Sequence, residues 1–151
     1  MTTHTNTFFL TTLLAAAAQA TTFTWNGGGT DANWLTDANW SGGTRPDSDG
    51  SALLAFAGNQ RPVTTNTCDA DTVFAGITFT NNKTNSLSSF TLAGNRLTLG
   101  GHVTTTASSP GTLSDTIALS LLLNAARTVT VNMAHHLTIS GVIGETGGSQ
   151  S

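Results

Sequence analysis

Apolar residues recur at every second position in several short runs of this chain. A period of two places successive side chains on opposite faces of an extended backbone, which is typical of a β-strand with one buried face. Turn-forming clusters rich in Gly and Asn separate the runs, because these residues tolerate the positive φ that others resist. The runs that predict strands are 53–56, 73–79, 90–92, 97–99, 129–131 and 137–139.

The segment from Ile117 to Ala126 also fits a helix, since it is rich in Leu and Ala. It lacks the charged face that a surface helix presents, and it lies between strand-like runs. We therefore predict a buried strand over residues 117–123.

Two architectures accommodate such strands: an antiparallel β-sandwich and a right-handed parallel β-helix. Periodicity alone does not separate them, but the spacing favours the second. Residues 90–101 and 137–144 share alternating apolar residues, a Gly turn and another apolar pair. Such recurrence is typical of solenoids with repeats of about twenty residues or more. We predict an all-β parallel β-helix, with the sandwich as the alternative.

The composition argues against several classes of partner. Charged residues make up 9% of the chain, and the formal net charge is −3. Nucleic acid requires a clustered basic surface, which five scattered Lys and Arg residues do not make. The single cysteine, Cys68, forms no internal disulfide, so packing and backbone pairing must hold the fold.

Residues 1–20 have the pattern of a signal peptide. The apolar stretch 8–18 leads into Ala-Gln-Ala at 18–20, the small-x-small pattern after which signal peptidase cuts. The stretch is shorter than the roughly 20 apolar residues of a membrane span. We predict cleavage between Ala20 and Thr21, export of the protein, and no membrane span in the mature chain.

The three tryptophans lie close together, at Trp25, Trp34 and Trp40. They form the block W-x-GGG-x-D-x-x-W-x-x-x-x-N-W, in which Asp-Ala-Asn-Trp occurs twice. This block resembles the entry segment of bacterial surface and secreted proteins built from autotransporter-associated β-strand repeats. The Ile-Thr-Phe at 77–79 and the segment 137–144 also fit that family, so the resemblance covers nearly all of residues 22–148.

The resemblance implies an architecture and a location but no chemistry. It implies a signal peptide at 1–20, a Trp/Gly-rich N-terminal cap at 21–50, β-helix coils at 51–148, and a disordered, truncated end at 149–151. Family members continue into further repeats. We therefore expect either a monomer or a protein that has lost downstream repeats.

The tryptophan block has two readings. Each Asp-Ala-Asn-Trp can close a local turn through its Asp or Asn side chain and direct the following indole to one side. The indoles would then cover the open end of the first coil, which a solenoid needs in order to avoid edge-to-edge association. Alternatively, Trp25, Trp34 and Trp40 contact a glycan, whose C–H faces match flat aromatic rings. We favour the cap.

No catalytic, cofactor or metal site is predicted. The Asp-rich turns at 47–51, 69–71 and 31–33 offer fewer oxygens than calcium requires. No nucleophile motif accompanies His102, and His135 and His136 point to opposite faces of a strand. Cys68 has no basic neighbour in sequence to lower its pKa, so we expect an inert thiol.

These observations lead us to expect a non-enzymatic β-helical module, secreted or at the cell surface, that serves as a structural or adhesive passenger. Its partner would be a surface glycan or another surface protein. The alternative is a carbohydrate-binding or polysaccharide-processing β-helix protein, which would need a groove lined by aromatic and acidic side chains.

Overall fold

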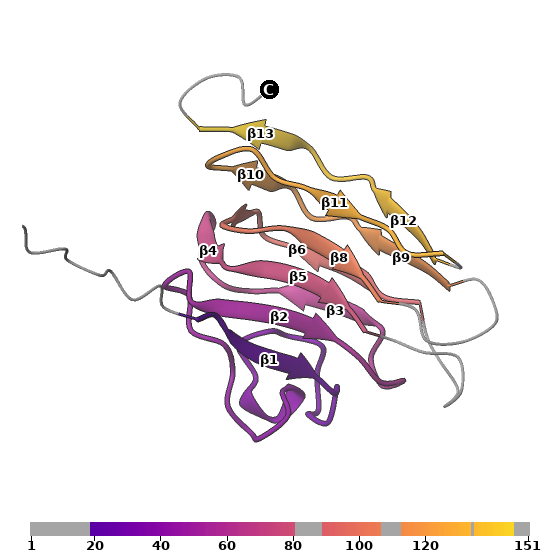
Figure 1. Ribbon diagram of the computed structural model, residues 1–151. Helices are drawn as coiled ribbons and strands as arrows, with labels where there is room; N and C mark the ends of the chain where they lie inside the picture. Colours follow the sequence, from indigo (N-terminus) through magenta and orange to yellow (C-terminus); the bar gives the residue numbers. More distant parts are fainter. Residues whose placement is uncertain (1–18, 81–88, 107–112, 134, 147–151) are drawn as a thin grey trace, which may run out of the picture.

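Strands form nearly all of the regular structure in this computed structural model, which describes residues 19–80, 89–106, 113–133 and 135–146 (Figure 1). Most of the predicted signal peptide and the end at 149–151 lie outside these ranges. A 3-10 helix, η1 (Asp37–Asn39), interrupts the strand order. The strands are β1 (Thr21–Trp25), β2 (Ala52–Phe56), β3 (Val63–Asn66), β4 (Thr72–Phe74), β5 (Gly76–Phe79), β6 (Thr91–Gly94), β7 (Leu97–Leu99), β8 (Val103–Thr105), β9 (Leu113–Ile117), β10 (Leu121–Leu123), β11 (Val129–Thr130), β12 (His135–Ile139) and β13 (Ile143–Glu145).

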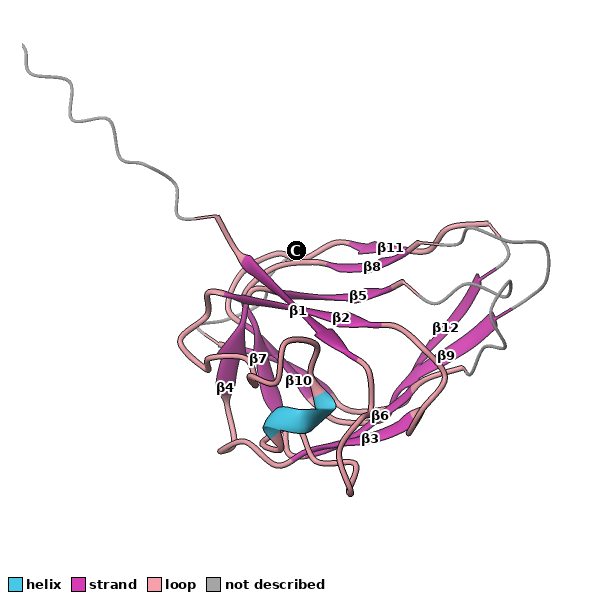
Figure 2. Cartoon of the chain, turned by 90° about the horizontal axis from the view of Figure 1, so that it is seen from below, coloured by secondary structure: helices cyan, strands magenta, loops and turns pink. Residues whose placement is uncertain are grey.

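The strands belong to three sheets, ordered β1-β2-β5-β8-β11, β12-β9-β6-β3 and β13-β10-β7-β4. All the pairings between these strands are parallel. The chain visits the sheets in turn, so each circuit adds one strand to each sheet. The result is a β-solenoid of about three turns. Figure 2 looks along its axis and shows the sheets as three sides around the core. The predicted parallel β-helix is confirmed, and the antiparallel sandwich is excluded.

Columns of stacked apolar side chains fill the interior. Because the ladders are in register, an inward residue of one coil lies over an inward residue of the next. Ile77 pairs with Val103, and Leu97 pairs with Leu121. The same packing pairs Leu92 with Ile117 in the second sheet. These residues all belong to one buried cluster that also contains the three tryptophans.

Two predicted strands are divided by corners of the solenoid. The run 73–79 forms β4 and β5, with Ala75 between them in a bend. Its amide donates to the carbonyl of Ala52, so the bend still continues the hydrogen bonding between coils. The prediction of one continuous strand over residues 117–123 is likewise wrong, because residues 118–120 form the corner between β9 and β10. Apolar residues at corners pack inward as strand residues do. The hydrophobic periodicity of the sequence therefore does not show where the chain bends.

The alternation of apolar residues does not predict several strands, because their inward positions are polar. β3 buries Thr64 and Asn66, and β8 buries Thr105. Each buried side chain has partners: Asn66 Nδ2 donates to the carbonyl of Asn95, and Thr105 Oγ1 accepts from the amide of Asn132. Satisfied polar groups cost little to bury, so these inward positions need not be apolar. The apolar pattern also does not predict β1, β13 or residues 113–116 of β9.

A glycine makes the corner between β6 and β7. Gly94 has φ +101°, and a Cβ there would lie 2.4 Å from the carbonyl oxygen of Asn66 in the coil below. Only glycine fits that close approach without a backbone shift. This corner is one of the Gly- and Asn-rich clusters that the sequence places between strand-like runs.

Candidate functional site: the tryptophan cap and a buried Asp–His pair

The segment after β1 folds over the N-terminal end of the solenoid, where η1 lies across the axis in Figure 2. Trp25 ends β1 and forms an antiparallel bridge with Trp40. The two rings meet edge to face with centroids 5.3 Å apart. Trp34 packs between Trp40 and the first coil, at centroid distances of 5.5 Å from Phe56 and 5.9 Å from Phe74. The indoles therefore complete the core at this end.

Hydrogen bonds fix two of the indoles. Trp34 Nε1 donates to Thr64 Oγ1 at 2.9 Å, and Trp40 Nε1 donates to the carbonyl of Trp34 at 2.8 Å. Trp25 Nε1 is buried and has no hydrogen-bond partner among the described residues. A buried indole N–H normally finds an acceptor, so the first two bonds orient their rings as well as satisfying the donor.

Asp31 and Asn39 organise the backbone of the cap. The Asp31 carboxylate accepts from the amide of Asn33 and the hydroxyl of Thr36, and these bonds lower the pKa of Asp31 below its ordinary value. The Asn39 side chain is fully buried. Its Nδ2 donates to the Asn33 carbonyl, and its Oδ1 accepts from the amide of Gly29. One buried amide thus ties the glycine triplet to both Asp-Ala-Asn-Trp copies.

The two Asp-Ala-Asn-Trp copies do not form equivalent turns. In the first copy Asp31 closes the expected turn onto the amide of Asn33, at 3.0 Å. In the second copy the chain enters η1, and the carboxylate of Asp37 accepts from the amide of Arg45 instead. The prediction of a local turn is therefore confirmed for the first copy and wrong for the second.

The cap also continues all three ladders beyond the first coil. β1 pairs with β2 along its full length. Asn33 forms a parallel bridge with Thr65 of β3, and Asp49 forms one with Val73 of β4. The cap therefore covers the outward edge of β2 along its length and contacts the edges of β3 and β4 at single bridges, while β1 becomes the outermost strand of its sheet and is bridged on its other side at Trp25. Covering strand edges in this way is expected of a terminal cap.

The tryptophan rings present no surface for a sugar in this conformation. Trp25 and Trp34 are fully buried, and Trp40 nearly so. Stacking on a saccharide requires an exposed aromatic face. The arrangement favours the cap reading, and the contact of these tryptophans with a glycan stays a prediction that only binding measurements test.

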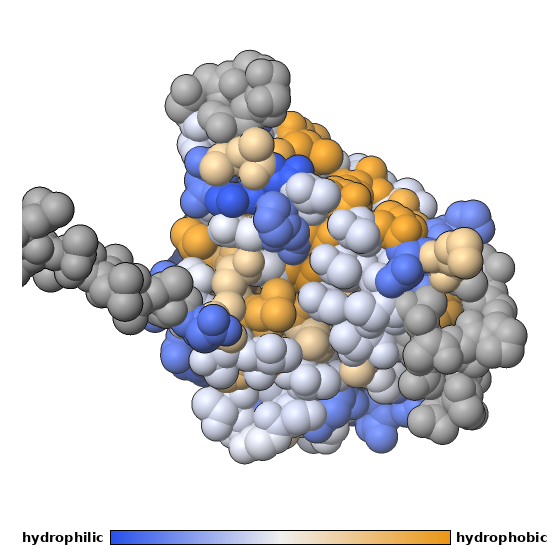
Figure 3. Space-filling view, in the orientation of Figure 1, coloured by the Kyte–Doolittle hydropathy of each residue, from blue (hydrophilic) through white to orange (hydrophobic). Residues whose placement is uncertain are grey.

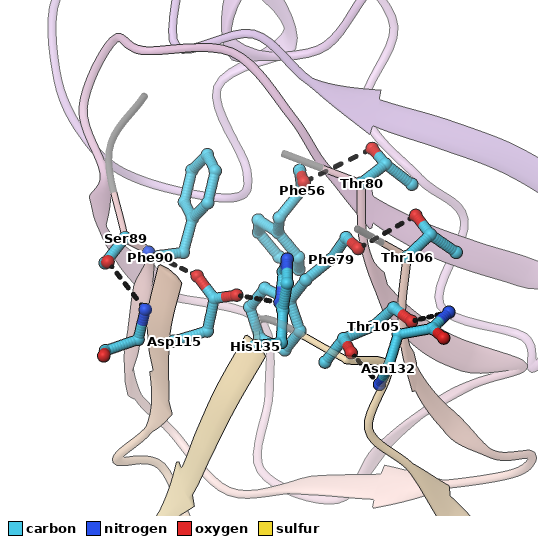
Figure 4. A network of polar contacts seen from close by, with 11 residues as sticks. Phe56, Phe79, Thr80, Ser89, Phe90, Thr105, Thr106, Asp115, Asn132 and His135 are labelled. Carbon is cyan, nitrogen blue, oxygen red and sulfur yellow. Dashed lines mark hydrogen bonds and ion pairs between the residues drawn. The ribbon is translucent and has the colours of Figure 1, made fainter. Parts of the chain in front are cut away.

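A buried ionisable pair lies at the far end of the core, between β9 and β12 (Figure 4). His135 Nδ1 is 3.3 Å from Asp115 Oδ2, and both side chains are fully buried. Asp115 Oδ1 also accepts from the amide of Phe90 at 2.7 Å. The His135 Nε2 atom has no hydrogen-bond partner among the described residues. Neither Asp115 nor His135 lines either of the two surface depressions described below.

The apolar runs do not predict this pair, because none of them includes residues 113–116 of β9. The signal was the alternation in Leu113-Ser-Asp-Thr-Ile117, which puts Asp115 on the same face as two apolar residues. The prediction that His135 and His136 face opposite ways is confirmed, since His135 is buried and His136 is exposed.

The other candidate side chains stay apart. Asp49 accepts from the amide and hydroxyl of Ser51, and Asp71 pairs with Arg96 at 2.7 Å. His102 Nδ1 accepts from the amide of Thr128. Burial raises the pKa of the Cys68 thiol, which fits the expected inert cysteine. Among the described residues, no group of three His, Cys, Asp or Glu side chains is placed to hold a metal ion.

Two surface depressions lie on the described part of the chain. One, of about 460 Å³, follows the corner of the coils past Arg96, Leu121 and Val142. The other, of about 210 Å³, lies beneath the cap and brings Asp47 and Asp69 to one hollow beside Arg45. The guanidinium of Arg45 supplies a positive charge beside these two carboxylates.

Comparisons of this chain with protein-family models, with curated proteins and with solved structures find no match. None of the helices in the described ranges is long and apolar enough to cross a membrane.

Proposed function

We propose that this chain is a non-catalytic β-helical passenger module of a secreted or cell-surface bacterial protein, related to the autotransporter-associated β-strand repeat proteins. The observation that carries the proposal is the combination of a parallel β-solenoid with a tryptophan cap at its N-terminal end. The same residues that resemble the entry segment of that family occupy the position of a terminal cap, with the rings buried.

The surface supports a structural or adhesive role over an enzymatic one. Among the described residues, no tryptophan or phenylalanine belongs to the exposed large apolar side chains. The only ionisable pair buried in the core of the described chain, Asp115 and His135, is closed off from solvent. An enzyme or lectin acting on polysaccharides needs accessible aromatic rings and carboxylates along one groove.

Export is the first test. The full chain is expressed in a Gram-negative host, and the exported fraction is analysed by N-terminal sequencing. We expect a mature protein that begins at Thr21, because small residues precede that bond. An Ala20→Lys variant places a large charged residue at the cleavage point and should accumulate unprocessed. Cytoplasmic protein that still begins at Met1 would contradict the proposed location.

Binding is the second test. Purified protein is applied to a panel of glycans and to immobilised bacterial cells. The proposal expects attachment to a cell surface or a purely structural role, with no release of sugar from polysaccharides. Turnover of any polysaccharide that is lost in an Asp115→Asn variant would refute the non-catalytic role.

A further inference from the structure

Threonines form a column on the outer face of the sheet β1-β2-β5-β8-β11. The strand register aligns one outward residue from each strand, and the aligned residues are Thr24, Ala55, Thr78, Thr104 and Thr130. Their neighbours in sequence point the other way, since Ile77, Phe79 and Val103 are buried in the core. The sheet therefore presents the same side chain at four of its five strands.

Two more threonines repeat this arrangement two positions further along the chain. Thr80 follows β5, and its amide and hydroxyl both donate to the carbonyl of Phe56. Thr106 follows β8 and makes the same two bonds to the carbonyl of Phe79. Figure 4 shows the two hydroxyl bonds side by side on successive coils. The segments 78–80 and 104–106 thus present Thr-x-Thr in register.

These threonines make a regular grid, because strand geometry sets both of its spacings. Neighbouring strands of a sheet are about 4.8 Å apart, and residues two positions apart along a strand are separated by about 6.7 Å. β5, β8 and β11 run nearly parallel in Figure 2, so the grid is close to flat across them. Branching at Cβ restricts the rotamers of threonine, so little freedom is lost when the grid binds a ligand. We call Thr78, Thr80, Thr104, Thr106 and Thr130 the threonine grid.

The threonine grid is accessible from solvent. Its members are partly exposed at 78, 80 and 104 and exposed at 106 and 130. Within the described chain, no side-chain hydrogen bond of the fold uses the hydroxyls of Thr78, Thr104 and Thr130. Figure 3 has the orientation of Figure 1, and it shows pale side chains of intermediate hydropathy over β5 and β8. These hydroxyls are therefore available to an external partner.

The same face carries no charge. The remaining outward positions within the five strands are Thr22, Leu53 and Gly76, so no ionisable side chain projects from them. His102 lies just before β8, and its Nδ1 accepts from the amide of Thr128. An ionic mineral or a charged polymer would find no complementary charge on such a surface. The partner that fits is uncharged, and it repeats at the spacing of the strands.

Two uncharged surfaces repeat on this scale, namely ice and a crystalline neutral polysaccharide. In cellulose and chitin, alternate sugars are turned over, so identical groups recur only at every second sugar. In ice, equivalent water oxygens recur at a spacing close to that of adjacent strands, and each oxygen both donates and accepts hydrogen bonds. A threonine hydroxyl also donates and accepts, and the methyl group beside it restricts the orientation of first-shell water. Identical threonines on successive strands therefore match ice better than a sugar chain.

We propose that the threonine grid on β5, β8 and β11 is an ice-binding surface. Its hydroxyls and methyl groups hold water molecules in positions that continue into the ice lattice. Each contact is weak, but all of them belong to one rigid face, so every contact after the first is made within the same complex. This activity goes beyond the passenger role proposed above and does not depend on it.

Partitioning into ice tests the proposal. Slowly growing ice excludes solutes that do not bind it, so part of a stirred solution is frozen, and the protein in each phase is measured by tryptophan absorbance. We expect the wild-type protein to be enriched in the ice. Thr104→Tyr places a bulky ring in the middle of the grid and should lower the fraction in the ice by at least about tenfold. Thr78→Tyr repeats the test on the adjacent strand, and circular dichroism checks that each variant folds.

Thr116→Tyr is the matched control. Thr116 is partly exposed, as Thr104 is, and it lies in an outward column of another sheet between Thr91 and Thr138. The residues two positions after these three are Ala93, Ala118 and Ser140, so that sheet lacks a second threonine column. The control should enter the ice as the wild type does.

Three results would overturn the proposal. The first is a wild-type protein that stays in the liquid. The second is equal retention in the ice by folded Thr104→Tyr and Thr78→Tyr, or a loss seen only with Thr116→Tyr. The third is binding to crystalline cellulose or chitin without binding to ice, which would assign the grid to a polysaccharide.

Discussion

Replacing Trp34 by alanine removes the side chain that joins the cap to the first coil. Truncation of a buried Trp in a core costs about 3 to 5 kcal/mol of unfolding free energy. Trp34 is fully buried and packs against Trp40, Phe56 and Phe74, so a full cavity remains. Its loss also leaves the buried hydroxyl of Thr64 without its donor, which adds about 1 kcal/mol. We expect a total near the upper part of the range.

Two further variants separate the contributions. Trp34→Phe keeps an aromatic ring in the cavity but lacks the N–H group, so it should cost less than the alanine variant. Leu35→Ala is the control for local disturbance, because the neighbouring Leu35 is 43% exposed and its truncation should cost less than about 1 kcal/mol. Urea unfolding followed by far-ultraviolet circular dichroism gives the free energies without depending on tryptophan fluorescence.

An unfolding free energy of Trp34→Ala within about 1 kcal/mol of the wild type would contradict this expectation. That result would mean that the cap does not contribute to the stability of the solenoid. Retained stability together with lost binding to a glycan would assign the indoles to a ligand surface instead.

Three other predictions concern charges and ions. Asp115→Ala strands His135 and the Phe90 amide in the core and should cost on the order of 3 kcal/mol in urea unfolding, whereas Asp115→Asn keeps an acceptor and should cost less. The pKa of Asp31 is lowered from 3.8, chiefly by the backbone amide of Asn33, so its stabilisation is complete above that value and is lost as the pH falls below it. The melting temperature should fall in acid, less steeply for Asp31→Asn than for the charge-matched Asp47→Asn. Adding a chelator should leave the melting temperature unchanged, and a large drop would reveal a structural metal ion.

The class of fold could be predicted because most inward positions are apolar and alternate strictly. Leu97 and Leu99 in β7, or Leu54 and Phe56 in β2, produce the period of two directly. The corners could not be predicted in the same way. At a corner the chain turns while its apolar side chains keep pointing inward, as at Leu119, so the local pattern does not change.

The candidate site was predictable only in part. The duplicated tetrapeptide indicated a cap, but its two copies are identical in sequence and therefore predict the same local turn. The turn at Asp31 forms because Asn39, eight residues further on, donates to its carboxylate and carbonyl. At Asp37 the corresponding turn does not form, because the carboxylate accepts from the backbone amide of Arg45 instead. Contacts at such separations belong to the tertiary fold, and short-range propensity does not contain them.

The buried polar groups also define how the coils stack. Shifting a strand by one residue exchanges its inward and outward sets. For β12 this slip would place His136 and Thr138 inside and turn Leu137 and Ile139 outward, and Asp115 would lose His135 at the same time. In the first coil the same slip of β3 would remove Thr64 from the indole of Trp34. Apolar columns alone tolerate some sliding, since Leu, Ile and Val fill similar volumes. The polar contacts at both ends of the stack penalise it, because each one leaves a buried group unpaired.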